Sequence, residues 1–133
     1  MPRSRTGRGG LLQIGQVAER TGLSLRTIRF YEENGLVVPS GRTDGGFRLY
    51  SDDDVARFAV IKQMKPLGFT LEEMGDLLDL LAGLRDHPHD EQRLDRLRMF
   101  HEAALARVTS LREQLDIAEG LATRLGRQLT TDG

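Results

Sequence analysis

Residues 23–36, LSLRTIRFYEENGL, decide the fold of the N-terminal half of this chain. Ser24 can cap a helix that runs to about residue 34, because its hydroxyl suits the N-cap position. Within this helix, Arg26 and Arg29 stand three residues apart and project together from one side. An exposed arginine pair beside Thr27 makes a poor core but a good surface for phosphates and base edges. The stretch therefore predicts a helix whose outer side binds DNA.

The residues before this helix predict a second helix that meets it across a tight turn. Ile14 and Ala18 share one helical face, and Gly22 stands at the expected C-terminal cap. A helix–turn–helix needs a small residue in its first helix, a turn residue that tolerates the left-handed conformation, and an apolar anchor in its second helix. Ala18, Gly22 and Ile28 meet these needs, and Leu25 is expected to point inward beside Ile28.

The next segment, residues 37–50 with the sequence VVPSGRTDGGFRLY, predicts a β-hairpin. The β-branched Val37 and Val38 are expected in its first strand, and the Asp-Gly-Gly run at 44–46 supplies the turn. Aromatic residues alternate with other residues in the predicted return strand. A hairpin after a helix–turn–helix indicates a wing.

Two further helices are predicted before residue 85. Ser51 with Asp54 resembles a capping box and begins the third helix, which Pro66 should end near residue 65. Thr70 with Glu73 begins the fourth helix, which carries one apolar face.

Beyond residue 90 the pattern changes to an apolar seam with alternating steps of three and four residues, kept over about five heptads. His101 is the polar residue in this seam. A helix of about 35–40 residues would be over ~50 Å long. It could fold against its own domain, but the preceding elements already cover one another, so we predict pairing with a second copy of the chain. The predicted dimerisation residues are Leu94, Leu97, Val108, Leu111, Leu115, Leu125 and Leu129.

Composition limits the classes of function. Residues 1–65 hold 11 Arg or Lys against 7 Asp or Glu, whereas residues 66–133 hold 8 against 13. This asymmetry favours an anionic partner for the N-terminal half, although the whole chain carries a net charge of only −1. The chain has no cysteine, which excludes disulfides, thiolate metal sites and cysteine nucleophiles.

Other patterns argue against secretion, membrane insertion and catalysis. The basic opening MPRSRTGRGG lacks the apolar run of a signal peptide and indicates a disordered arm. The apolar-rich run at 77–84 contains Asp79 and is far shorter than the roughly 20 residues that a membrane span needs. No nucleophile with a base and no phosphate-cradling glycine loop is present. We expect a soluble cytoplasmic protein that is not an enzyme and has no membrane contact.

The stretch from about Leu12 to Leu81 resembles the N-terminal winged-helix DNA-binding domain of the MerR family of bacterial transcription regulators. The motifs T-I-R-F-Y-E-x-x-G-L, G-F-R-L-Y and L-G-F-T-L-E-E carry this resemblance. The family's layout continues with a long C-terminal helix that forms an antiparallel coiled coil in the homodimer. The expected fold class is therefore mainly α, with a winged helix–turn–helix domain followed by a long dimerisation helix.

The resemblance implies roles for individual residues. It implies major-groove contacts from Arg26 and Arg29, a backbone contact from Tyr31, phosphate contacts from the wing, and a weaker backbone contact from the third helix. Phe30 is assigned to packing. The predicted DNA-binding residues are Arg26, Thr27, Arg29, Tyr31, Arg42, Phe47, Arg48, Tyr50 and Lys62.

These predictions combine into one domain plan and one leading function. The expected segments are a basic arm at 1–11, the winged helix–turn–helix domain at 12–84, a linker at 85–90, the dimerisation helix at 91–129 and a tail at 130–133. The leading function is a homodimeric, sequence-specific regulator of transcription. As the resemblance implies, such a regulator bends and untwists double-stranded promoter DNA with too long a spacer, and so acts on RNA polymerase indirectly through the DNA.

Three alternatives stay open at the level of sequence. The chain could be an architectural DNA-bending dimer without an effector, or a coiled-coil adaptor whose basic face binds something other than DNA. It could also sense nickel, cobalt or zinc through His87, His89 and His101, although solvated histidines are the simpler interpretation and no cofactor is expected. The family's cysteine sensors and appended ligand-binding domains are not expected here, and a small-molecule effector is left open.

Overall fold

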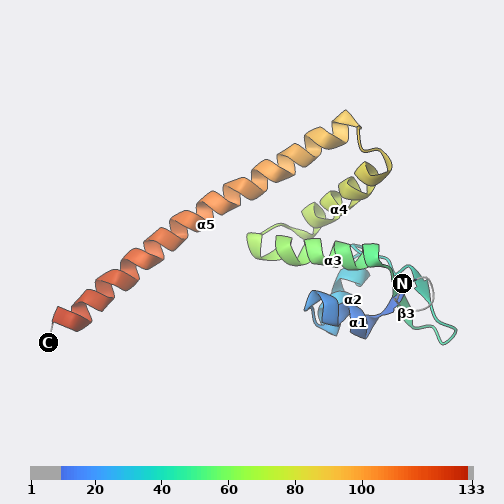
Figure 1. Ribbon diagram of the computed structural model, residues 1–133, viewed down its shortest axis with the longest axis horizontal. Helices are drawn as coiled ribbons and strands as arrows, with labels where there is room; N and C mark the ends of the chain where they lie inside the picture. Colours follow the sequence, from blue (N-terminus) through green and yellow to red (C-terminus); the bar gives the residue numbers. More distant parts are fainter. Residues whose placement is uncertain (1–9, 132–133) are drawn as a thin grey trace. The chain divides into compact units, whose positions relative to one another are not determined.

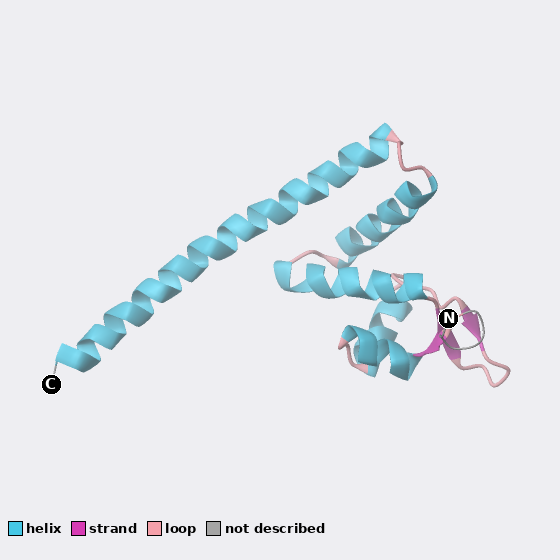
Figure 2. Ribbon diagram, in the orientation of Figure 1, coloured by secondary structure: helices cyan, strands magenta, loops and turns pink. Residues whose placement is uncertain are grey.

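The computed structural model describes residues 10–131, so most of the predicted basic arm lies outside the described residues. The chain divides into two compact units, one that ends at Pro88 and one that begins at His89. The first unit contains a small sheet and four α-helices, and the second is a single long helix (Figures 1 and 2).

The sheet of the first unit has three short antiparallel strands in the order β1-β3-β2. These are β1 (Leu12–Gln13), β2 (Gly41–Arg42) and β3 (Arg48–Tyr50). The hairpin is present, but the expectation that its first strand begins at Val37 and Val38 is wrong. Pro39 follows these valines and has no N–H to donate to a strand ladder, so pairing begins only at β2. Strand β1 was not predicted.

The helix–turn–helix consists of α1 (Ile14–Thr21) and α2 (Leu25–Glu33), which pack against each other. The predicted caps are confirmed: Gly22 has a φ of 75°, and the Ser24 hydroxyl accepts a hydrogen bond from the Thr27 amide at 3.0 Å. Ile28 is fully buried as expected. Leu25 is exposed, contrary to expectation, as are its neighbours Ser24 and Arg26 at the start of α2.

The third and fourth helices are α3 (Asp52–Met64) and α4 (Leu71–Asp86), joined by the 3₁₀ turn η1 (Lys65–Leu67). Both predicted capping boxes are present, at Ser51 and at Thr70. Pro66 lies inside η1, so α3 ends where the sequence predicted. Helix α4 continues to Asp86, two residues into the predicted linker.

The core of the first unit gathers where α3 packs against α1 and β3 (Figure 1). Its largest fully buried side chains include Tyr50, Phe58, Leu12, Ile28 and Ile61. The rings of Tyr50 and Phe58 meet edge to face, with centroids 6.1 Å apart. This core fixes the positions of α2 and of the wing.

The second unit is α5 (Glu91–Thr131), a continuous helix of 41 residues and therefore about 60 Å long. The Asp90 carboxylate accepts a hydrogen bond from the Gln92 amide at 3.0 Å near the start of the helix. Its later seam leucines are exposed, at Leu111, Leu115, Leu125 and Leu129. Among residues 10–131, no helix is long and apolar enough to cross a membrane.

Candidate nucleic-acid interface

The outer face of α2 carries the predicted arginine pair. Arg26 and Arg29 are exposed, and no hydrogen bond or ion pair engages either side chain within the described part of the chain. Thr27 lies between them in sequence, and its hydroxyl accepts a hydrogen bond from the Ser24 hydroxyl at 2.8 Å. The two guanidinium groups are therefore available to a ligand, whereas Thr27 also holds the helix start.

Phe30 belongs to the same exposed face, because it follows Arg26 by one helical turn. The sequence analysis assigned it to packing, and the structure agrees only in part. Its ring packs against Tyr31 with centroids 5.4 Å apart, yet the residue is 45% exposed. An exposed apolar ring between arginines is suited to contact a thymine methyl group or a sugar.

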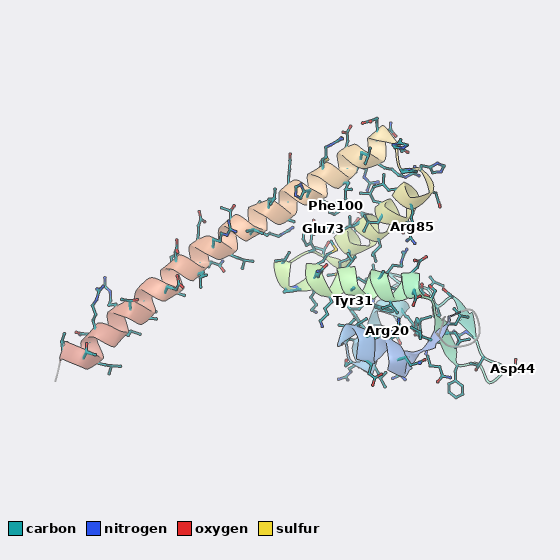
Figure 3. All side chains as sticks on the ribbon, in the orientation of Figure 1. Arg20, Tyr31, Asp44, Glu73, Arg85 and Phe100 are labelled. Atoms are coloured by element: carbon teal, nitrogen blue, oxygen red, sulfur yellow. The ribbon has the colours of Figure 1, made fainter. Side chains whose placement is uncertain are left out.

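The wing projects as a turn between β2 and β3. The Thr43 amide donates to the Phe47 carbonyl at 2.8 Å, and Gly46 has a φ of 87°, which favours glycine. Phe47 is 71% exposed, and Asp44 projects from the tip of the turn (Figure 3). The Arg42 guanidinium donates to the Gly46 carbonyl at 2.9 Å, so this side chain lies along the wing.

A buried charge cluster joins the wing to α2. The Glu32 carboxylate, with its side chain only 5% exposed, forms an ion pair with Arg48, in which Oε1 lies 2.8 Å from the Arg48 Nε. Its other oxygen accepts a hydrogen bond from the Tyr50 hydroxyl, whereas Oε1 has no hydrogen-bond donor among the described residues. Burial raises the pKa of Tyr50 well above its ordinary value, and the hydrogen bond to Glu32 and the charge of Glu32 act in the same direction. The nearby charges of Arg48 and Arg29 oppose this shift. The sequence analysis did not single out Glu32.

Two predicted contact residues lie beneath the surface instead of on it. Tyr31 is buried, which raises its pKa, and Tyr50 is 0% exposed. Neither offers a hydroxyl surface to a phosphate in this structure. Both rings lie in the apolar core of the domain, because burying a large aromatic ring is favourable.

Lys62 also has a partner within the domain. Its Nζ donates to the Thr21 carbonyl at 2.7 Å, at the C-terminal end of α1. A lysine at this end compensates unpaired carbonyls and the negative pole of the helix. A Cβ on Gly22 would lie 2.7 Å from the same Nζ, so glycine leaves room for the contact. Lys62 thus joins α3 to α1.

A pocket of about 130 Å³ opens between the start of α1, the outer face of α2 and the wing. Its lining residues are Gln13, Ile14, Arg29, Gly46, Phe47 and Arg48. Arg29 and Arg48 give it positive charge, and the first amides of α1 add the positive pole of a helix. This combination suits one phosphate group. Gln13 and Ile14 were not predicted to take part, because their role depends on how the wing folds back.

The histidines show no metal-binding arrangement. His87, His89 and His101 are exposed. Within residues 10–131, no group of three or more His, Cys, Asp or Glu side chains is placed to hold a metal ion.

Comparison with known protein families gives this geometry a context. The family profile described as "MerR HTH family regulatory protein" matches residues 12–81, and the profile "MerR, DNA binding" matches residues 55–119. The chain belongs to the MerR family of transcriptional regulators. The MerR-family match covers the helix–turn–helix, the wing and the first part of α5, which confirms the predicted family and fold class.

Individual MerR-family proteins agree with this assignment. The HTH-type transcriptional regulator CueR of Salmonella typhi is 36% identical over 106 residues, which cover 78% of this chain and 76% of CueR. A MerR family regulator from Bacillus cereus has a crystal structure with 30% identity and a TM-score of 0.57, covering 84% of this chain and 75% of its own.

A DNA-bound MerR family structure shares the fold. HiNmlR, a MerR family regulator lacking the sensor domain, was crystallised bound to promoter DNA. It is 24% identical, with a TM-score of 0.62 over 80% of this chain and 79% of its own. At 24% identity, the similarity between this chain and HiNmlR shows a shared fold and no more. The chain is thus a helix–turn–helix transcriptional regulator, as predicted.

Proposed function

We propose that this MerR-family regulator binds promoter DNA as a homodimer and changes the shape of that DNA. The observation that carries the proposal is the arginine pair on the exposed face of α2 beside a basic wing, since neither Arg26 nor Arg29 has a partner among residues 10–131. An α-helix fits the major groove of B-form DNA, where arginine can donate two hydrogen bonds to a guanine edge. The fold that this chain shares with promoter-bound HiNmlR supports the same placement.

The wing supplies the contacts that position the protein. Arg42, Phe47 and Arg48 would follow the DNA backbone beside the groove that α2 enters. The pocket lined by Arg29 and Arg48 would receive one phosphate, because positive charge and helix amides converge there. Tyr31 and Tyr50 would act from beneath by holding α2 and β3 in place.

Dimerisation would occur through α5 as an antiparallel coiled coil. The exposed leucines of its seam need a partner, since a long apolar stripe in water is unfavourable. A second copy of the chain is the simplest partner and would present two copies of α2 to a two-fold symmetric DNA site. A dimer that binds both half-sites can bend and untwist the DNA between them. Elastic estimates put the cost of such bending at about 1–6 kcal/mol for a site of roughly 20–30 base pairs.

The dimer would then influence RNA polymerase only by changing the shape of the promoter DNA. The dimer would act in the cytoplasm, without a catalytic step, and would alter how the two promoter elements face the polymerase. Any effector would act without thiol chemistry, because the chain has no cysteine.

Selection from a random duplex library tests the proposal. The wild-type protein should enrich a two-fold symmetric sequence, and Arg26→Ala should weaken its binding about tenfold or more. Arg124→Ala is the matched control, because it removes the same charge from an exposed position on α5 away from the seam. Binding without sequence preference would indicate an architectural protein, and no binding to DNA would indicate an adaptor; either result contradicts the proposal.

A further inference from the structure

A buried carboxylate lies between α2 and the wing, the two elements that we propose to contact DNA. Glu32 stands on α2 three residues after Arg29, with its side chain 5% exposed. Negative charge at this place disfavours a polyanionic ligand, and burying a carboxylate is itself costly unless it is well paired. Glu32 therefore needs an explanation other than direct contact with DNA.

The pairing of Glu32 supplies that explanation. One carboxylate oxygen forms an ion pair with Arg48 at 2.8 Å from its Nε, and the other accepts a hydrogen bond from the Tyr50 hydroxyl. Arg48 and Tyr50 are two apart on β3, so both side chains leave the strand on the same face. Strand β3 is the middle strand of the sheet, and Tyr50 is anchored on Phe58 of α3. Glu32 thus connects α2 to the most firmly held strand of the wing.

The same contact decides how Arg48 can act. Its Nε lies 2.8 Å from the buried Glu32 carboxylate in an ion pair, while the two terminal nitrogens of the guanidinium have no hydrogen bond or ion pair within residues 10–131. An ion pair with a buried carboxylate restricts the rotamers of this side chain, and the planar guanidinium then holds its two terminal nitrogens at a set position. Arg48 also lines the pocket beside Arg29. It would therefore present its donors at a set position relative to the recognition helix.

We propose that Glu32 is a positioning residue for DNA selectivity. By holding Arg48 and β3 against α2, it lets Arg48 contact a phosphate only when the duplex has the shape that also fits α2. The negative charge of Glu32 also repels every duplex, so a duplex that does not gain the Arg48 contact binds weakly. This inference rests on the proposed binding of DNA by this surface.

Glu32→Gln tests the inference, since glutamine has nearly the same shape and no charge. Anisotropy titrations would use two labelled duplexes of equal length and composition: one enriched from a random library by the wild-type protein, and its scrambled form. Glu32→Gln should weaken binding to the enriched duplex about tenfold or more, because the held position of Arg48 is lost. Binding to the scrambled duplex should stay equal or become tighter, because one negative charge is removed.

Glu33→Gln is the matched control. Glu33 is the next residue on α2, is exposed and has no partner in the described part of the chain. Removing its charge should tighten binding to both duplexes by the same factor and leave their affinity ratio unchanged. A purely electrostatic effect would make the two glutamine variants behave alike, and this result would overturn the inference.

Arg48→Lys provides an independent test that does not depend on how well Glu32→Gln folds. Lysine keeps the charge but lacks the planar guanidinium that Glu32 holds in place, so the affinity ratio should fall as it does for Glu32→Gln. Adding Glu32→Gln to Arg48→Lys should lower the ratio no further, because the two residues act through one contact. Unchanged selectivity of Arg48→Lys, or additive losses in the double variant, would overturn the inference.

The experiments distinguish a failure of the proposed function from a failure of the role of Glu32. If the wild-type protein enriches no duplex, the proposed function and this inference both fall. If it enriches a duplex and Glu32→Gln keeps the wild-type ratio, only the role of Glu32 is wrong.

Discussion

Replacing Tyr50 by phenylalanine probes the contact on which the first unit and its wing depend. The Tyr50 side chain is fully buried, its hydroxyl donates to the Glu32 carboxylate, and its ring packs on Phe58. Tyr50→Phe keeps the ring and removes only the hydroxyl. One oxygen of a buried carboxylate then loses its donor.

The size of the effect follows from this geometry. A hydrogen bond to a charged group contributes about 1.5–3 kcal/mol, and the phenylalanine ring leaves the surrounding core unchanged. We expect the free energy of unfolding at pH 7 to fall by about 2 kcal/mol. Urea denaturation followed by circular dichroism measures this difference between the wild type and Tyr50→Phe.

The difference should also depend on pH. Burial and Glu32 raise the pKa of Tyr50 in the folded protein above the unfolded value of 10.0. The stability that this group contributes is therefore complete below pH 10 and is lost as pH rises toward the folded pKa. The wild type should lose about 1.4 kcal/mol per pH unit relative to Tyr50→Phe above pH 10. Tyr31 also has a raised pKa, but both proteins contain it and its effect cancels.

Two results would refute this reasoning. Equal stability at pH 7 would mean that the Tyr50 hydroxyl makes no net contribution. A difference that stays constant from pH 7 to pH 11 would mean that Tyr50 is not held in its protonated form by burial and Glu32.

Four further expectations concern the dimer, the wing, a helix cap and the response to thiol reagents. Leu111→Asp with Leu115→Asp should give a monomer in sedimentation, because it buries unpaired charge in the seam, and a persisting dimer would contradict the coiled coil. Arg42→Ala should weaken binding to all duplexes alike and reduce the salt slope by about one phosphate contact, so a sequence-dependent loss would argue for base contact. Ser51→Ala removes the acceptor of the Asp54 amide at 3.1 Å and should lower unfolding free energy by about 1 kcal/mol in urea denaturation; no loss would deny the cap a role. Thiol alkylation should leave DNA binding unchanged in anisotropy titrations, since the chain has no cysteine, and an altered affinity would point to modification elsewhere.

Local patterns were enough to predict the helices and most of their ends, although α4 runs two residues further than expected. Ser24, Ser51 and Thr70 each accept a hydrogen bond from the amide three residues later, and Gly22 takes the left-handed conformation. These features involve residues within one turn of each other, so the sequence alone contains the information for them. The long helix was predicted for the same reason, because its heptads repeat over the whole segment. Helical spacing also identified Arg26 and Arg29 as a pair on one face of α2.

Features that join distant residues appeared only in the tertiary structure. Strand β1 exists because Leu12 meets Tyr50, 38 positions later in the chain, and no local pattern predicts that pairing. The same holds for Glu32, whose charge is buried only because β3 brings Arg48 and Tyr50 to it. Lys62 and Tyr50 were predicted to face DNA, yet the fold gives them partners at the end of α1 and on α2. Spacing along a helix tells which side chains share a face, but only packing between elements decides which of those side chains still face the solvent.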